Sequence, residues 1–169
     1  MTTALVESCR MFMSAYPTGV AVVTAISPEG EPCGLTCSSL ISVTLSPPTF
    51  LVSMNIHSRT LAAALGSGGF GVNLLPARAR PVAELFSSLT ADRFSSVQWS
   101  PYGRLGLPRL EEDLHGWAEC LVEQVWTVTD HALVLGRVTE IHSAPETPLL
   151  YGFRQYSVWR TEGERTLSA

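Results

Sequence analysis

Hydroxyl, amide and guanidinium side chains gather at both ends of a strand-like stretch in the first half of the chain. Thr36, Ser38 and Ser39 precede the stretch, and residues 55–60 (Asn-Ile-His-Ser-Arg-Thr) follow it, directly before a run of small helix-forming residues. Hydroxyl groups and the free N–H groups at a helix start bind oxyanions, and Arg59 adds a bidentate, charge-assisted donor. The pattern predicts a site for a polar, phosphorylated ligand. The alternative is an exposed edge strand whose hydroxyls simply face water.

The elements that must position these donors are mainly strands. Segments rich in β-branched or alternating apolar residues predict strands over residues 19–27, 31–44, 49–54, 70–75, 114–129 and 132–142. Apolar residues spaced three and four apart, with breaks at Pro and Gly, predict helices over residues 4–17, 60–65 and 76–89. Residues 92–108 are predicted as a long loop, and residues 151–159 as a final aromatic segment.

A proline pair interrupts the central stretch. Pro47 and Pro48 cannot donate to a sheet ladder, so the chain must stop or turn there. The apolar residues on either side are expected to face a core: Leu35, Leu40, Ile41, Val43, Leu45, Phe50, Leu51 and Val52. Because regular strand–helix alternation is missing, a parallel doubly wound sheet is excluded. The expected fold is mainly β with peripheral helices, most simply a β-barrel.

Composition narrows the classes of partner. The 169 residues suit a single domain spanning residues 1–169, and 46% hydrophobic against 15% charged residues indicates a globular chain. The net charge is −4, and the 11 basic residues form no run, so neither nucleic acid nor a membrane is expected as a partner. The four cysteines match no zinc pattern and no export signal is recognised, which predicts free thiols, no metal and a cytoplasmic location.

Several short motifs stand in a characteristic order along the chain. They are Gly34–Ser39, Ser42-Val43, Pro47-Pro48, Ser58–Thr60, Phe70–Asn73, Asp92–Phe94, Gly106–Pro108, Trp117–Cys120, Asp130-His131 and Tyr151–Arg154. This ordered set, from about residue 12 to residue 159, resembles the flavin reductase component of two-component flavin-dependent monooxygenases. Two positions depart from that family: Thr129 stands where it often has Gly, and the Tyr151–Tyr156 tail differs from its usual Tyr-Arg-Gly-x-Tyr.

The resemblance implies an FMN-binding split β-barrel with a core over about residues 12–159, usually a homodimer with flavin sites near the subunit interface. It also implies that the protein oxidises NADH (or NADPH) and reduces FMN or FAD, which then diffuses to a partner oxygenase. Trp117, Tyr151 and Trp159 would need cover in a single barrel, which also favours a dimer. Two alternatives remain: a non-catalytic flavin- or haem-binding carrier or sensor, and a structural dimer module with a vestigial pocket.

The site residues are carried over from the matching motifs. The resemblance implies flavin contacts from Gly34, Leu35, Thr36, Ser38, Ser39, Ser53, Met54, Asn55, Ser58, Arg59 and Thr60, with His131, Tyr151 and Arg154 completing the site. His131 is expected at the nicotinamide as the catalytic residue that orients it, because hydride passes directly between the two rings. The competing interpretations are a local turn histidine for His131, a surface arginine for Arg59, and core filling for Met54.

Overall fold

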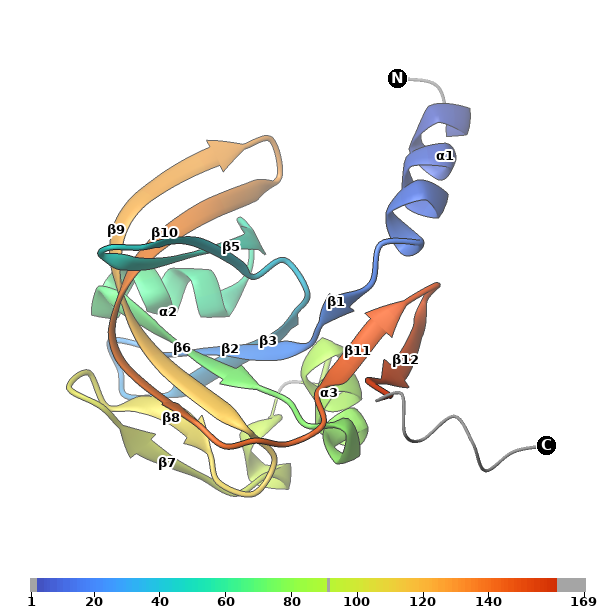
Figure 1. Ribbon diagram of the computed structural model, residues 1–169. Helices are drawn as coiled ribbons and strands as arrows, with labels where there is room; N and C mark the ends of the chain where they lie inside the picture. The colour runs from blue at the N-terminus through green and yellow to red at the C-terminus, as the bar shows by residue number, and fades with distance from the viewer. Residues whose placement is uncertain (1–2, 91, 161–169) are drawn as a thin grey trace.

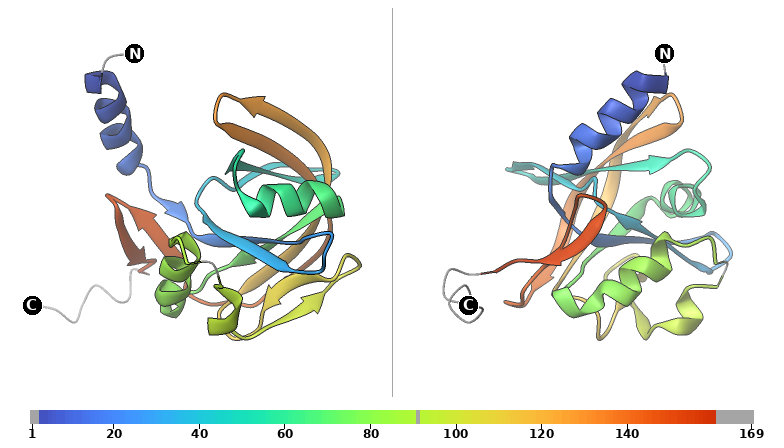
Figure 2. Two further views of the ribbon diagram at one scale, coloured as in Figure 1. Left: turned by 180° about the vertical axis from the view of Figure 1, so that it is seen from behind. Right: turned by 90° about the vertical axis from the view of Figure 1, so that its right-hand side faces the viewer.

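The computed structural model describes residues 3–90 and 92–160, and its main element is a strongly curved antiparallel sheet (Figure 1). The strand order is β3-β2-β6-β9-β10-β5-β4. These strands span Ala21–Ile26 (β2), Pro32–Cys37 (β3), Ile41–Leu45 (β4), Pro48–Asn55 (β5), Gly69–Leu74 (β6), Gly116–Val128 (β9) and His131–Ser143 (β10). The sheet curls into an open barrel, and helix α2 (Arg59–Ser67) packs against it with one face buried and the other exposed, so the predicted mainly β fold with peripheral helices is confirmed (Figures 1 and 2).

Helix α2 is short but has well-defined ends. Ser58 caps its first turn, because its Oγ accepts hydrogen bonds from the backbone N–H groups of Thr60 and Leu61. The helix is followed by Gly68 in the left-handed conformation that such a C-terminus requires. Between the caps, Ala63 and Ala64 are buried, and their small side chains let the helix approach the sheet closely.

A second layer packs against one end of the barrel. It contains the three-stranded sheet β1-β11-β12, helix α3 and the hairpin β7–β8 (Figure 1). The bounds are Thr18–Gly19 (β1), Leu149–Gly152 (β11), Gln155–Val158 (β12), Arg80–Ser87 (α3), Trp99–Tyr102 (β7) and Leu107–Leu110 (β8). Short 3-10 turns, η1 (Ala77–Ala79) and η2 (Phe94–Ser96), flank this layer. Its own core forms around Phe86, Phe94 and Leu110.

The predicted strand over residues 31–44 is wrong as a single strand. The chain bends at residues 38–40, so that β3 pairs with β2 while β4 pairs with β5 on the far edge of the sheet. The turn predicted at Pro47-Pro48 is confirmed, and it forms the β4–β5 hairpin. The expectation of buried side chains fails on β4, because Ile41, Val43 and Leu45 are all exposed on this edge strand. The predicted loop over residues 92–108 also contains the unforeseen hairpin β7–β8.

Helix α1 (Thr3–Ser14) stands away from the barrel (Figures 1 and 2). It ends three residues before the predicted limit and has no buried residues, although its sequence is amphipathic. Phe12 is 78% and Met11 66% exposed. No helix in the described part of the chain has the length and apolar character needed to cross a membrane.

Trp117 was expected to need a second subunit to shield it from solvent, but it is already buried within one subunit. It is only 1% exposed, and Tyr102 of β7 packs edge-on against it at 4.9 Å between ring centroids. The hairpin that sequence patterns missed therefore supplies the cover. Trp126, by contrast, is 46% exposed near the β9–β10 turn, where the two long strands extend beyond the barrel (Figure 1).

Candidate functional site

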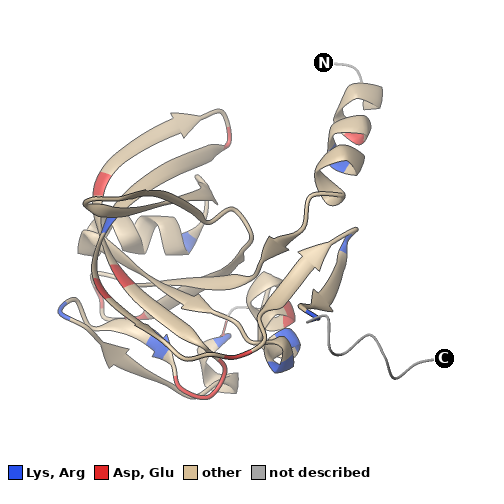
Figure 3. Cartoon of the chain, viewed as in Figure 1, with Lys and Arg blue, Asp and Glu red and all other residues tan. Residues whose placement is uncertain are grey.

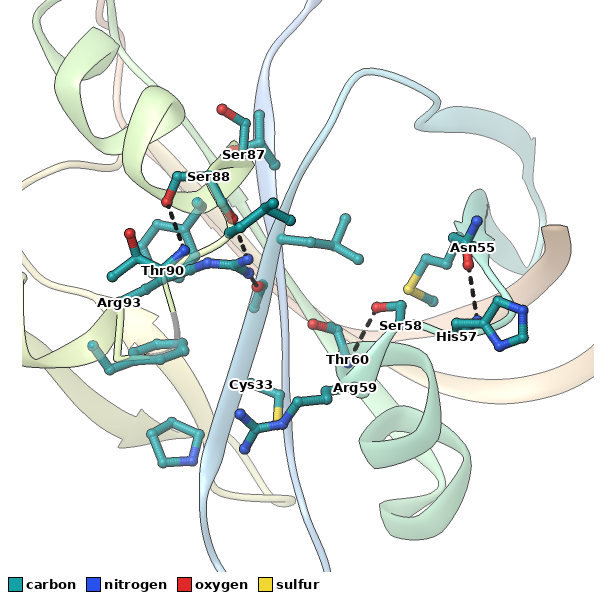
Figure 4. A pocket seen from close by; sticks show the side chains of 18 of the residues that line it. Cys33, Asn55, His57, Ser58, Arg59, Thr60, Ser87, Ser88, Thr90 and Arg93 are labelled. Carbon is teal, nitrogen blue, oxygen red and sulfur yellow. Dashed lines mark hydrogen bonds between the residues drawn. The ribbon is translucent and has the colours of Figure 1, made fainter. Parts of the chain in front are cut away.

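A cavity of about 690 Å³ opens between the β3 strand, the end of β5, the first turn of α2 and the segment that follows α3 (Figure 4). This volume lies in the range of small-molecule and cofactor sites. Ten of the fourteen predicted site residues line it: Gly34, Leu35, Thr36, Ser53, Met54, Asn55, Ser58, Arg59, Thr60 and His131. The structure thus brings together residues from β3, β5, α2 and β10, which local patterns cannot place beside one another.

The loop before α2 is held by its own hydrogen bonds. Asn55 Oδ1 accepts from the His57 N–H at 2.9 Å (Figure 4), and the Ser58 N–H donates to the Asn55 carbonyl at 2.9 Å. These bonds fix the entry into α2, so its positively polarised N-terminus opens onto the cavity together with Arg59. The arrangement suits a phosphate or another oxyanion.

Arg93 holds the opposite wall. Its Nη1 donates to the Gly34 carbonyl at 2.7 Å, and its Nη2 donates to the Ser88 carbonyl, which ties the segment after α3 to β3 (Figure 4). Phe86 and Phe94 pack edge-to-face beneath this wall, with ring centroids 5.1 Å apart. A Cβ on Gly34 would lie 2.8 Å from Phe86, so the close approach of β3 to this wall requires glycine.

The charge of the cavity is opposite to that of the whole chain. Among the described residues, its lining contains Arg59, Arg93, His57 and His131 but no Asp or Glu, although the chain carries a net charge of −4. Elsewhere in the described part of the chain, the acidic and basic positions are scattered over many elements (Figure 3). The donor set therefore fits an anionic ligand with phosphate groups, which is what a flavin nucleotide carries.

His131 begins β10 and pairs with Asn55 across the β5–β10 ladder. Its Nδ1 lies 2.9 Å from Asp130 Oδ1, and its side chain is 45% exposed. The turn before His131 places Thr129 in the left-handed region (φ 53°). Glycine adopts this conformation most readily, which explains why the family that the sequence resembles often has Gly at this position. Asp130 thus orients the imidazole ring of His131, and this ring lines the cavity. Such a fixed ring could position a ligand.

The other four predicted residues lie elsewhere. Ser38, Ser39, Tyr151 and Arg154 line a second cavity of about 850 Å³, which also includes residues of α1. Ser53 lines both cavities, so they adjoin at β5. Ser39 Oγ donates to the Ser53 carbonyl and accepts from its N–H, each at 3.1 Å, so this hydroxyl holds the bend after β3 onto β5. Arg154 lies 3.4 Å from Glu7 of α1.

Sequence reasoning missed the wall after α3. Ser87, Ser88, Thr90 and Arg93 all line the first cavity, as does Cys33. Arg93 stands in one of the resemblance motifs, but nothing in the local pattern pairs it with a strand some sixty residues earlier. Met54 both lines the cavity and is almost fully buried, so core packing and ligand contact are compatible for this side chain.

Comparisons with known proteins agree on one family. The family model described as "Flavin reductase like domain" matches residues 13–160. A flavin reductase (NADPH) of Lentzea aerocolonigenes is 52% identical over 91% of this chain and 90% of its own length. A flavin reductase (NADH) of Kitasatospora aureofaciens is 40% identical over 93% of this chain and 83% of its own.

Solved structures show the same fold. The crystal structure of nitrilotriacetate monooxygenase component B from Mycobacterium thermoresistibile superposes with a TM-score of 0.87 at 30% identity. The match covers 99% of this chain and 93% of that one, so the expected split-barrel class is confirmed. Family model, relatives and fold agree over nearly the whole chain, and the protein belongs to the flavin reductase-like domain family.

Proposed function

We propose that this protein is an NAD(P)H:flavin oxidoreductase that supplies reduced flavin to a separate flavin-dependent monooxygenase. Membership of the flavin reductase-like family confirms the general activity that the resemblance predicted. The observation that carries the site assignment is the cavity lined by two arginines and no carboxylate, at the N-terminus of α2. The similarity to a monooxygenase component supports the transfer of reduced flavin to a second protein.

In this proposal the cavity residues bind the flavin and orient the nicotinamide beside it. The flavin, when bound, supplies the ring that accepts the hydride. The first turn of α2 and Arg59 hold the phosphate, because helix N–H groups and a guanidinium both favour an oxyanion. The ends of β3 and β5 contribute Thr36, Ser53 and Asn55 beside the ring system. His131, held by Asp130, orients the nicotinamide, since a hydride transfer between stacked rings needs alignment and no proton donor.

We also propose a homodimer. Exposed apolar side chains gather on α1, on β4 and at the end of the β9–β10 pair, and patches of this kind usually mark an interface. The second cavity lies between α1 and the barrel, where a second copy would contact Tyr151 and Arg154.

One domain over residues 1–169 and a cytoplasmic location are further parts of the proposal. The four free cysteines agree with a reducing compartment.

The decisive assay mixes the protein with NADH or NADPH and excess FMN or FAD under anaerobic conditions and follows the absorbance of the reduced nucleotide. Catalytic turnover of free flavin is the expected result. Flavin binding without turnover would favour the non-catalytic carrier or sensor. Neither binding nor turnover would favour a structural module with a vestigial pocket.

A further inference from the structure

Two arginines share one carboxylate at the edge of the second cavity. Arg10 of α1 and Arg154 of the β11–β12 turn line this cavity, and no described Asp or Glu does. Arg10 Nη1 lies 3.6 Å from Glu7 Oε2, and Arg154 Nη2 lies 3.4 Å from Glu7 Oε1. Within the described residues, one negative charge therefore faces two positive charges. Guanidinium groups that converge on one oxyanion are the arrangement with which proteins bind a phosphate group.

The backbone places Arg154 at this edge in an unfavourable conformation. Gly152 pairs with Gln155, so Phe153 and Arg154 form a two-residue hairpin loop. Both lie in the left-handed region, with φ of 50° and 59°, where such loops usually have Asn and Gly. The Phe153 N–H donates to the Ser14 carbonyl, which ties the loop to the end of α1 (Figure 1). Strained backbone of this kind is typical of ligand clamps, so it points to a role for Arg154 beyond an exposed ion pair.

The second cavity continues the first along one strand pair. In the β5–β10 ladder, His131 lies opposite Asn55 and Leu133 lies opposite Ser53. Side chains two residues apart on a strand share a face and are separated by about 7 Å. His131 lines the first cavity, Leu133 lines the second, and Ser53 lines both. A dinucleotide whose nicotinamide lies at His131 can therefore extend past Ser53 into the second cavity.

The lining of the second cavity suits the adenosine half of that dinucleotide. Tyr16 and Tyr151 offer aromatic faces on which a purine can stack, and Thr18 and Ser38 add hydroxyl groups. NADPH differs from NADH only by a phosphate on the adenine ribose, and a phosphate monoester carries a charge of about −1.5 to −2 at pH 7. Only NADPH therefore brings an additional oxyanion to the two arginines.

We propose that NADPH is the preferred nicotinamide nucleotide of this protein, and that Arg10 and Arg154 bind its 2′-phosphate in place of Glu7. The inference rests on the proposed flavin reductase function and names the residues that select the nucleotide. Glu7 is 53% exposed, so its carboxylate can turn into solvent when the phosphate replaces it, and no buried charge is left without a partner.

The test measures kcat and KM for NADPH and for NADH separately, at saturating flavin. The wild-type protein should have the higher kcat/KM with NADPH. Arg10→Gln and Arg154→Gln should each raise the KM for NADPH about tenfold, the loss expected for a charge-assisted hydrogen bond. The kcat should change little, because a contact far from the reacting rings stabilises ground state and transition state alike. The KM for NADH should stay near that of the wild type.

Glu7→Gln should act in the opposite direction. It removes the carboxylate that competes with the phosphate, so the KM for NADPH should fall while the KM for NADH stays unchanged. A merely structural ion pair would make the Glu7 and Arg154 variants change the kinetics in the same direction. Arg80→Gln and Glu84→Gln are the matched controls, since this ion pair is similarly exposed, at 62% and 52%, and lines neither cavity. Neither control should change either KM.

Four outcomes would overturn the inference. One is a wild-type kcat/KM for NADH equal to or above that for NADPH, which leaves the reductase function standing. Another is an equal effect of the arginine variants on both nucleotides, or none on either. In the third, only the KM for flavin changes, and the second cavity then serves the flavin. In the fourth, light scattering shows that the arginine variants dissociate a dimer, and a second copy then occupies the cavity. Turnover with neither nucleotide would contradict the proposed function itself.

Discussion

At the scale of single residues, the carboxylate of Asp130 sets the orientation of His131. The pKa of Asp130 is lowered, chiefly by its hydrogen bond with His131 and further by its own backbone N–H and Thr129. A carboxyl group whose pKa is lowered in the folded state stays ionised at pH values below its ordinary range, and it becomes protonated only as the pH falls through the lowered value. The Asp130 carboxylate is therefore ionised throughout the neutral range and can accept the hydrogen bond from His131.

This arrangement predicts the behaviour of His131→Asn. Asparagine keeps polarity and some hydrogen bonding but does not titrate, so a measurable fraction of the turnover should remain, with a raised KM for NADH and a flavin affinity near that of the wild type. Steady-state rates measured from pH 5 to pH 8 check this, because the loss should be similar at each pH. A wild-type rate whose change with pH disappears in the variant would indicate a general acid instead.

At the scale of elements, the contact between β3 and the wall after α3 depends on Gly34. We predict that Gly34→Ala destabilises the fold, because its Cβ would meet Phe86 at 2.8 Å and Phe94 at 3.1 Å. Overpacking of this kind typically costs about 1–3 kcal/mol. Thermal or urea unfolding measures the loss. Gly19→Ala is the matched control, since nothing lies within 4 Å of a Cβ there, and an equal loss in both variants would contradict the packing argument.

Helix α1 offers a second prediction at this scale. Because α1 buries none of its residues against its own barrel, removing residues 1–13 should leave the melting temperature of an isolated subunit nearly unchanged. The exposed ion pair between Glu7 of α1 and Arg154 contributes little to the free energy of unfolding. The truncation should instead convert the proposed dimer to a monomer, as measured by light scattering. Phe12→Ser is the milder test, and a monomeric wild-type protein with full activity would contradict the dimer.

At the scale of the whole molecule, the buried thiols make the free energy of unfolding depend on pH in the alkaline range. Burial raises the pKa of Cys120 from 9.0 to about 12, and burial also raises the pKa values of Cys33 and Cys37. The folded state keeps these protons when the unfolded chain loses them. The stabilisation is therefore fully present below pH 9 and is lost as the pH rises towards 12.

Cys120→Ala tests this dependence. A pKa difference is worth about 1.4 kcal/mol per unit, so Cys120 alone contributes a loss of up to about 4 kcal/mol across that interval. The free energy of unfolding should fall less steeply above pH 9 in the variant than in the wild type, despite a lower starting value from the lost packing against Phe70 and Val138. Cys9→Ala, at an exposed site, should leave the slope unchanged.

Local sequence patterns were enough to predict most helices and strands and the part of the site at the start of α2. β-branched alternation identifies β2, β6 and β10, and the Ser58 cap before small residues identifies the start of α2, because these features depend on neighbours a few positions away. The donors of residues 55–60 were visible for the same reason. The family resemblance supplied the barrel class and the flavin chemistry, which no periodicity contains.

Long-range packing decided the rest. Residues 31–44 read as one strand, yet sheet order sends their two halves to opposite edges and carries Ser38 and Ser39 to a second cavity. The hairpin β7–β8 covers Trp117 from outside the barrel. Arg93 reaches the site only because α3 packs against β3. Each of these contacts joins residues far apart in the chain, and its free energy comes from closing the whole barrel and its second layer, which a local pattern does not record.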